Sequence, residues 1–231
     1  INFEENQKGK RQMNPMIIPV IHFQSDDQVR RNVDISVAAG CKAIMLIDMT
    51  GQNLEMIESA IKTKEQHPDL LVGANHLAER ASDALTYNIS DGLDMTWTDE
   101  QLTHSQRELS YENVSLALKL EAHPEHLFFC GVAFKHQNHE PDPVKAALRA
   151  EDSGFIATTS GPATGMPAEE QAIANLRKGM GPEAKLAIAS GITPTNFLKF
   201  KPYLTHVLVA TGISRSFYEI DEDKLSRLMS L

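Results

Sequence analysis

Residues 43–50 read Ala-Ile-Met-Leu-Ile-Asp-Met-Thr, five apolar residues in a row followed by an acid, and further apolar runs of strand length recur along the chain. A run that is apolar at every position is typical of a parallel strand buried on both faces, whereas a half-exposed strand alternates apolar with polar residues. We therefore predict a parallel sheet. Its strands are expected at Met16–Phe23, Ala43–Thr50, Leu70–Leu77, Gly92–Thr98, Leu127–Lys135, Gly154–Gly161, Leu186–Ile192 and Val207–Ser214.

The segments between these runs carry helix signals. Ser25 with Gln28 forms a capping box, and Gly40 supplies the stop of the first helix. Asn53 is expected to cap a second helix, which His67-Pro68 ends. Pro167 and Thr193-Pro194 mark the starts of two more helices.

Eight strands alternating with helices in 231 residues predict a single (β/α)₈ TIM barrel, a fold that typically takes about 250 residues. The alternative is an open doubly wound α/β sheet, which usually carries a glycine-rich first turn where this chain has His22-Phe23-Gln24-Ser25. We expect a polar extension over residues 1–14 and the barrel over 15–231. The polar stretch from Asp99 to Asn113 is expected to be a loop or lid.

Composition narrows the partners and the compartment. A formal charge of −9 disfavours nucleic acid and anionic membranes, and no apolar run approaches the roughly 18 residues of a membrane span. Cys41 and Cys130 lie in apolar stretches, which favours reduced thiols, and residues 1–14 lack the apolar segment of a secretory signal peptide. We expect a cytoplasmic protein, with a homo-oligomer left open.

Two glycine turns predict a phosphate site at the ends of the last two strands. A phosphate needs approachable backbone N–H groups, a helix N-terminus and nearby hydroxyl or cationic donors. Barrels frequently bind phosphate at these two loops with a short extra helix, expected here at Ser214–Tyr218, although two ordinary tight turns would give the same pattern. The expected phosphate-binding residues are Ser190, Gly191, Ile192, Thr211, Gly212, Ile213, Ser214 and Arg215.

Three strand-end residues are candidate catalytic groups, because barrel chemistry occurs where strands end. Asp48 is a candidate general base, with helix capping as the alternative. Lys135, which shares a face with Gly131 by the two-residue period, is an anion anchor or an amine nucleophile. His22 polarises or protonates the reacting group, or is structural.

Other strand-end residues are expected to line the mouth and bind substrate, with Asp94 also able to pair with Lys135. They are Asn75, Asp94, Thr96, His136, Thr159 and Gly161. We predict no cofactor. A divalent metal stays open through His22, Asp48, His76, His136 and His139, but the chain lacks the His-x-His and His-Glu-x-x-His spacings of zinc sites.

Short motifs along the chain resemble the BtpA family of (β/α)₈ proteins, named for a photosystem I biogenesis factor and also represented in sugar-metabolism operons. The matching motifs are Pro19-Val20-Ile21-His22, Gly73-Ala74-Asn75-His76-Leu77, Phe134-Lys135-His136, Thr159-Ser160-Gly161 with Thr164-Gly165, Ala189-Ser190-Gly191-Ile192-Thr193 with Asn196, and Thr211-Gly212-Ile213-Ser214.

The chain departs from the BtpA pattern after three strands. Phe23-Gln24-Ser25-Asp26 replaces Leu-Pro-Pro-Leu-Pro-Gly, Asp48-Met49 replaces Glu-Asn, and Asp94, Thr96 and Trp97 stand where the family often has Arg and Asn. The resemblance implies the barrel fold and the placement of the phosphate loops, but the family lends no settled reaction.

The function predicted from the sequence is acid–base chemistry on a small phosphorylated metabolite, such as a sugar phosphate or a nucleotide-like compound. An isomerase, a lyase or a phosphoribosyl-type transferase would fit. The alternatives are a non-catalytic assembly or metabolite-sensing factor and a metal-dependent hydrolase.

Overall fold

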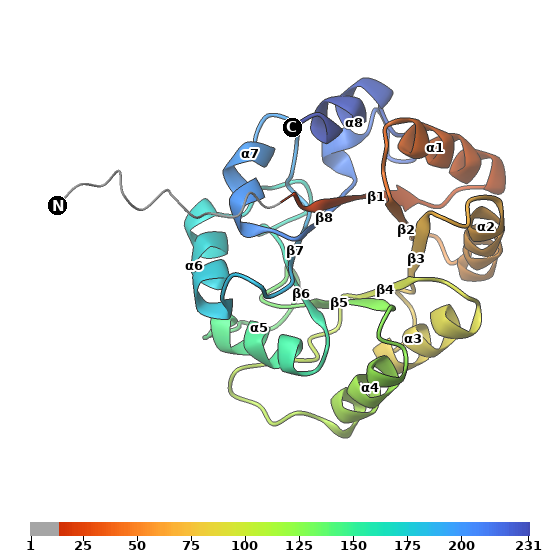
Figure 1. The fold of residues 1–231 in the computed structure, drawn as a ribbon. Coiled ribbons are helices and arrows are strands. Elements are labelled where there is room, and N and C mark those ends of the chain that lie inside the picture. Colours follow the sequence, from red (N-terminus) through yellow and green to blue (C-terminus); the bar gives the residue numbers. More distant parts are fainter. Residues whose placement is uncertain (1–13) are drawn as a thin grey trace.

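The computed structural model describes residues 14–231, which form a closed barrel of eight parallel strands in sequence order (Figure 1). Strand β8 pairs with β1, so the barrel has no free edge. The (β/α)₈ prediction is confirmed and the open sheet is wrong, while residues 1–13 of the expected extension lie outside the described residues. The strands are β1 (Met16–His22), β2 (Ala43–Ile47), β3 (Leu71–Asn75), β4 (Met95–Thr98), β5 (Leu127–Gly131), β6 (Ile156–Thr159), β7 (Leu186–Ala189) and β8 (His206–Val209).

Helices surround the barrel, and local signals explain where several of them begin. Ser25 caps α1, since its side chain accepts a hydrogen bond from the Gln28 amide at 3.3 Å. Asn53 does not cap α2, because its side chain contacts the His76 ring at 3.1 Å instead. The helices are α1 (Asp26–Ala38), α2 (Asn53–Gln66), α3 (Ala81–Ser90), α4 (Tyr111–Ala122), α5 (Pro143–Asp152), α6 (Glu170–Met180), α7 (Phe197–Phe200) and α8 (Glu222–Met229), with 3₁₀ turns η2 (Lys201–Tyr203) and η3 (Thr211–Ile213).

The core has two concentric layers, and they show which strand residues face the barrel axis. The outer layer lies between strands and helices and is the larger. The inner layer fills the barrel, and residues two apart along a strand belong to the same layer. The buried inner residues are Ile18, Val20, Ala43, Met45, Ile47, Met95, Trp97, Phe129, Phe134, Ile156, Ala187, Ala189 and Leu208.

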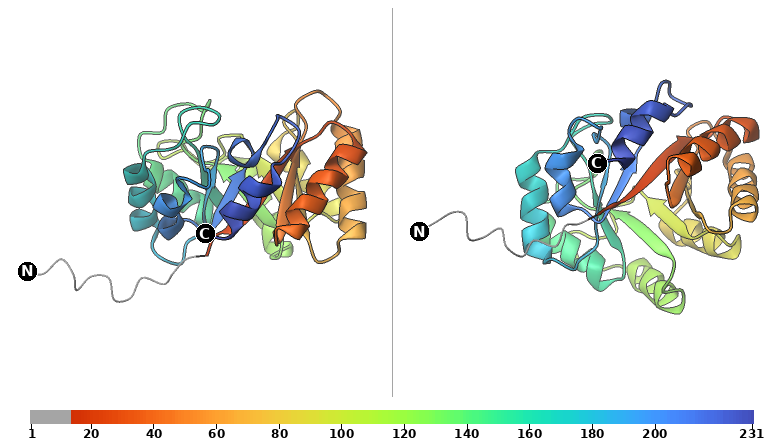
Figure 2. Two further views of the ribbon diagram at one scale, coloured as in Figure 1. Left: turned by 90° about the horizontal axis from the view of Figure 1, so that it is seen from above. Right: turned by 45° about the horizontal axis from the view of Figure 1, so that its top comes forward.

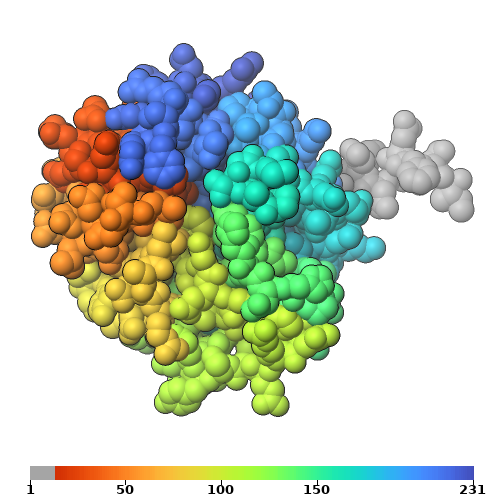
Figure 3. Space-filling model, turned by 180° about the vertical axis from the view of Figure 1, so that it is seen from behind, coloured from red at the N-terminus to blue at the C-terminus, as the bar shows by residue number. Residues whose placement is uncertain are grey.

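All eight strands end at the same side of the barrel, because they are parallel. Their following loops gather at the end opposite the C-terminus (Figure 2). We call this end the mouth. From the side opposite to Figure 1, the loops after β2, β5, β6 and β8 surround the barrel axis (Figure 3). Within residues 14–231, no helix has the length and apolarity to cross a bilayer.

Candidate functional site

In strand β4, the residues that face the barrel axis are not the ones predicted. The prediction was Asp94 and Thr96. Met95 and Trp97 belong to the inner layer. Thr96 therefore faces the helices, where its hydroxyl bonds the His126 ring at 2.8 Å and accepts from Asn88 of α3 at 3.0 Å. The expectation that Thr96 lines the mouth is wrong, because its polar group is satisfied outside the barrel.

Asp94 lies at the end of the barrel away from the mouth, directly before β4. Its carboxylate accepts a hydrogen bond from the Val72 amide at 2.8 Å and pairs with Lys64 at 2.9 Å. The expectations that Asp94 binds substrate and pairs with Lys135 are therefore wrong.

The acid that does reach the mouth is Asp99, which the sequence had placed only in a loop. It follows Trp97 by two residues, so the period of the inward-facing residues pointed to it. Its side chain keeps solvent-exposed surface and lies near enough to Asn75 and Lys135 to interact with both. Burial raises the pKa of Asp99, and the charge of Lys135 and the side chain of Asn75 offset this only in part.

Lys135 reaches the mouth by a route that the two-residue period did not predict. Strand β5 ends at Gly131, and Ala133 has a left-handed φ of 46° that breaks the alternation. Phe134 consequently faces inward, its ring 6.2 Å from that of Trp97. The Lys135 ammonium lies 5.4 Å from the Phe134 ring centre and 3.2 Å from the Thr164 hydroxyl. Burial lowers the pKa of Lys135, which Asp99 partly opposes.

His22 ends β1 beneath an aromatic cover. Its ring stacks on Phe217 with centroids 4.1 Å apart and planes 24° from parallel. Burial lowers the pKa of His22; a hydrogen bond to the Phe217 carbonyl opposes the shift, and the charge of Lys135 adds to it. The imidazole is thus held in the neutral form at pH 7, in which one ring nitrogen accepts hydrogen bonds.

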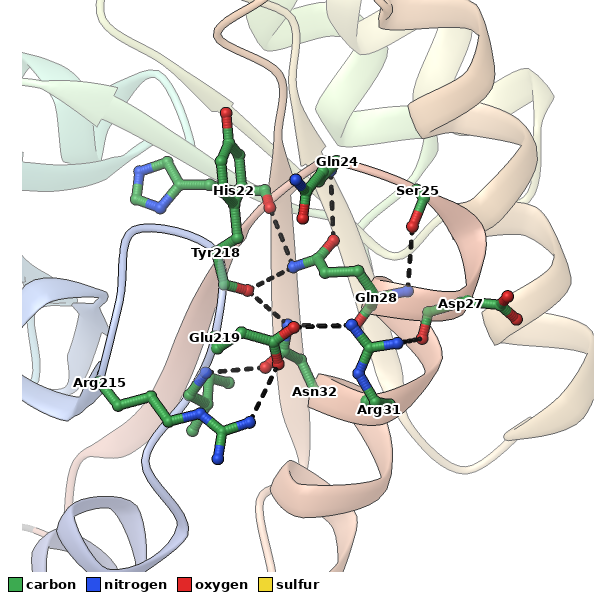
Figure 4. Close-up of polar contacts among 11 residues, drawn as sticks. His22, Gln24, Ser25, Asp27, Gln28, Arg31, Asn32, Arg215, Tyr218 and Glu219 are labelled. Carbon is green, nitrogen blue, oxygen red and sulfur yellow. Dashed lines mark hydrogen bonds and ion pairs between the residues drawn. The ribbon is translucent and has the colours of Figure 1, made fainter.

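Two buried amides of α1 fix the loop that carries Phe217 (Figure 4). Gln28 donates to the carbonyls of His22 and Tyr218. Asn32 donates to the same Tyr218 carbonyl at 2.8 Å and accepts from the Ile220 amide at 2.8 Å. The position of Phe217 is therefore set by α1.

Asp48 is buried but does not face the barrel axis, since Ile47 is the inner-layer residue at the end of β2. Its carboxylate accepts from the amide of Thr50 at 2.9 Å and from the hydroxyl of the same residue at 2.8 Å. Burial alone would raise the pKa of Asp48, but hydrogen bonds from Thr50 and from the Gln52 and Gly51 amides outweigh it and lower the pKa. The expected inward placement is wrong. Asp48 does not cap α2 either, because its hydrogen bonds at 2.9 and 2.8 Å come from Thr50 in the loop before the helix, and α2 has no side-chain cap.

The two glycine turns are neighbours, as the phosphate prediction requires. A Cβ on Gly212 would overlap the Ile192 carbonyl oxygen, and a Cβ on Gly191 would overlap the Met166 carbonyl oxygen. These glycines thus allow three loops to pack backbone against backbone. Within the described chain, the amides of Gly191 and Gly212 donate no hydrogen bond to another protein group.

Of the remaining residues expected at the phosphate site, some have side chains free to meet a ligand and others are buried or bound to protein groups. Thr211 is exposed and Ile213 is buried. The Ser214 hydroxyl donates to the Ala210 carbonyl at 2.8 Å. Arg215 lies 3.6 Å from Glu219. The extra helix is η3, which ends before Ser214, so its expected position at Ser214–Tyr218 is wrong.

The β6 loop closes one side of the mouth. Thr159 pairs in register with the outer-layer residue Ile188, so Thr159 faces the helices and its expected inward placement is wrong. Gly161 packs against the Met166 backbone. His136 is exposed beside the mouth, where its charge acts on Asp99.

The histidines considered for metal binding do not cluster. His76 bonds Asn53 and Asn88 outside the barrel. Among residues 14–231, no group of three or more His, Cys, Asp or Glu side chains is placed to hold a metal ion.

Unsatisfied and strained groups occur at the mouth. Three of the nine buried side-chain polar atoms that lack a hydrogen-bond partner in the part of the chain that the structure describes are Asn75 Nδ2, Trp97 Nε1 and Ser190 Oγ. Among residues 14–231, the non-glycine residues with positive φ are Ala133 (46°), His136 (68°) and Ser190 (92°), and all three follow β5 or β7. Native proteins retain such orphaned atoms and backbone strain chiefly at functional sites. The mouth is therefore the candidate site.

Comparisons with solved structures find barrels of similar shape and distant sequence. One is 3-hexulose-6-phosphate synthase, with a TM-score of 0.69, 11% identity, and coverage of 93% of this chain and 98% of that one. A second is phosphoribosyl anthranilate isomerase from Thermotoga maritima, with a TM-score of 0.64, 13% identity, and coverage of 94% of this chain and 98% of that one. A third is 2-keto-3-deoxy-6-phospho-gluconate aldolase from Zymomonas mobilis, with a TM-score of 0.59, 16% identity, and coverage of 94% of this chain and 91% of that one. These likenesses show the fold alone. No family model and no curated protein sequence matches the chain.

Proposed function

We propose that this protein is an enzyme that binds a small phosphorylated metabolite at the barrel mouth and moves protons on it, as an isomerase, a lyase or a phosphoribosyl-type transferase does. One observation carries the proposal: Asp99 and Lys135 share the mouth, with the pKa of the acid raised and that of the amine lowered. Both shifts bring the groups nearer to neutral pH, where an acid–base pair is most effective.

The phosphate is assigned to the turns after β7 and β8. Ser190 offers a hydroxyl without a partner, and Gly191 and Gly212 offer uncommitted amides. Such amides and hydroxyls are the usual donors to phosphate in barrels. Three solved barrels of similar shape are named for phosphorylated sugars or sugar derivatives, which supports the same substrate class.

Each remaining group receives a role from its environment. Asp99 takes the place of Asp48 as general base, because Asp48 is occupied by its own loop. Lys135 anchors or polarises the reacting end, and His22 accepts a hydrogen bond through its neutral ring. A BtpA-like relationship is the finer proposal, supported by the motifs that contain His22, Asn75 and Lys135.

A thermal-shift screen with inorganic phosphate, ribose 5-phosphate, fructose 6-phosphate and nucleoside monophosphates tests the proposal. A ligand at 100 times its Kd stabilises the folded state by about 2.7 kcal/mol. Ser190→Ala should weaken binding about 3- to 10-fold, whereas Ser226→Ala on the exposed face of α8 should not. Absence of a shift with every phosphate compound would refute the site.

Asp99→Asn and Lys135→Met should retain phosphate binding and lose turnover of whichever phosphate ester the screen identifies. Unchanged turnover in both variants would remove them from the mechanism. The buried, free thiols of Cys41 and Cys130 support the proposal of a cytoplasmic setting for this chemistry.

A further inference from the structure

Asn75 and Trp97 lie side by side inside the barrel. They are register partners on the neighbouring strands β3 and β4. Paired residues on adjacent strands are separated by about 5 Å. Trp97 belongs to the inner layer, and Asn75 faces inward with it because Asn75 is also the register partner of the inner-layer residue Ile47. Their polar groups thus enter the same region, directly below Asp99.

Both side chains present a buried N–H group that has no partner. The side-chain nitrogens Asn75 Nδ2 and Trp97 Nε1 are each shielded from solvent and make no hydrogen bond at bonding distance. Asp99 approaches Asn75 closely enough to be stabilised by it, but the Nδ2 atom still lacks a properly placed acceptor. An orphaned buried donor is costly, so two of them on paired residues point to an acceptor that a ligand supplies.

We propose that these two N–H groups receive the carbonyl oxygen of the substrate, which makes the substrate a phosphorylated aldehyde, ketone or keto acid. The inference rests on the proposed function, which seats the phosphate on the turns after β7 and β8. The indole N–H can only donate, so its partner must be an acceptor. Two donors suit an oxygen that gains negative charge during the reaction.

We call the two N–H groups of Asn75 and Trp97 the oxyanion hole. The reaction that uses this hole is proton removal from the carbon beside the carbonyl. The Asp99 carboxylate takes the proton, the C–H electron pair forms a C=C bond, and the carbonyl π electrons move onto the oxygen. Asn75 and Trp97 then hold an enolate, which Asp99 reprotonates at the adjacent carbon or at oxygen. No further reactant is required.

Access to the hole depends on Asp99. Among the three residues, Asn75 and Trp97 are buried whereas Asp99 is exposed. Rotation of the Asp99 side chain away from Asn75 therefore admits a ligand oxygen without rearrangement of the barrel core. The low polarity around Trp97 and Phe134 strengthens the hydrogen bonds made there.

Calorimetric titration with matched compounds tests the hole. 3-Phosphoglycerate and 5-phosphoribonate carry a carboxylate that imitates the enolate oxygen, while glycerol 3-phosphate and ribitol 5-phosphate carry a hydroxymethyl group in the same place. At least one carboxylate compound should bind about 10-fold more tightly than its alcohol partner. Trp97→Phe, which keeps the ring and removes the N–H, should abolish most of that advantage and leave inorganic phosphate affinity unchanged.

Asn75→Leu provides a second variant in case Trp97→Phe destabilises the barrel, and unfolding curves of both report their stability. Alcohol phosphates that bind wild type as tightly as the carboxylates would overturn the inference alone, and so would an advantage that survives in both variants. If neither inorganic phosphate nor any phosphate ester binds, the proposed function fails and the inference falls with it.

Discussion

The imidazole of His22 and the phenyl ring of Phe217 form a stacked pair at the barrel mouth, with centroids 4.1 Å apart. One partner ends the first strand and the other belongs to the loop before the last helix. The pair thus couples the protonation of a mouth histidine to the position of a C-terminal loop.

Replacing Phe217 with Ala should raise the pKa of His22 toward its ordinary value of 6.5, since burial is the main cause of its depression. An NMR titration of the imidazole protons measures the shift. Phe217→Tyr keeps the stacked ring and should leave the pKa as it is. An equal pKa in the Ala variant and wild type would show that other atoms bury the ring.

Ser190 carries both backbone strain and an unpartnered hydroxyl. Its φ of 92° suits glycine, so Ser190→Gly should raise the free energy of unfolding by about 1 kcal/mol, whereas Ser190→Ala keeps the strain. Both variants lose the hydroxyl and should weaken phosphate binding alike. Urea unfolding and calorimetry separate the two effects, and a Gly variant less stable than the Ala variant would contradict the strain argument.

Asn32 holds the loop below Phe217 through the Tyr218 carbonyl and the Ile220 amide. Asn32→Leu leaves the Ile220 amide without its partner, whereas the Tyr218 carbonyl keeps the hydrogen bond from Gln28, so the substitution should cost about 1–3 kcal/mol. Hydrogen exchange at the Ile220 amide should accelerate. Asn175→Leu, at an exposed position on α6, is the control. Unchanged exchange at Ile220 would show that the loop holds its place without α1.

Burial lowers the pKa of His126 and of His206 to about 4 from 6.5. The unfolded chain therefore binds more protons than the folded one as pH falls from 6.5 to about 4, and stability should fall across this window. Each histidine contributes on the order of 3 kcal/mol. Urea unfolding at a series of pH values measures the slope.

His126→Asn should make that slope shallower, whatever it does to stability at pH 7. His139→Asn is the control, because His139 is exposed. The same slope in the His126 variant and in wild type would contradict the assignment.

The strands were predictable because buried parallel strands are apolar along their whole length, but the facing of β4 was not. Residues 94–97 alternate polar and apolar, and both sets are buried or half-buried. Thr96 faces outward only because Asn88 and His126 satisfy its hydroxyl there, a contact between distant segments. If Trp97 had been taken as an inward-facing residue, the two-residue period of a strand would have placed Asp99 at the mouth.

Lys135 shows the opposite case, in which the correct location followed from incomplete reasoning. Its expected direction assumed a regular strand as far as residue 135, whereas β5 ends at Gly131 and the chain turns at Ala133. A left-handed alanine has no sequence signature. Phe134, which a regular strand would have turned toward the helices, therefore lies inside the barrel.

The pairing of β1 with β8 joins residues such as Met16 and His206, which are almost the whole described chain apart. Closing so long a loop has a large entropic cost, and contacts of this sequence separation slow folding. During synthesis, the strand edges of β1 and β7 that pair with β8 stay exposed until residues 206–209 have left the ribosome. That interval is when this protein is most open to strand-to-strand aggregation and to chaperone capture.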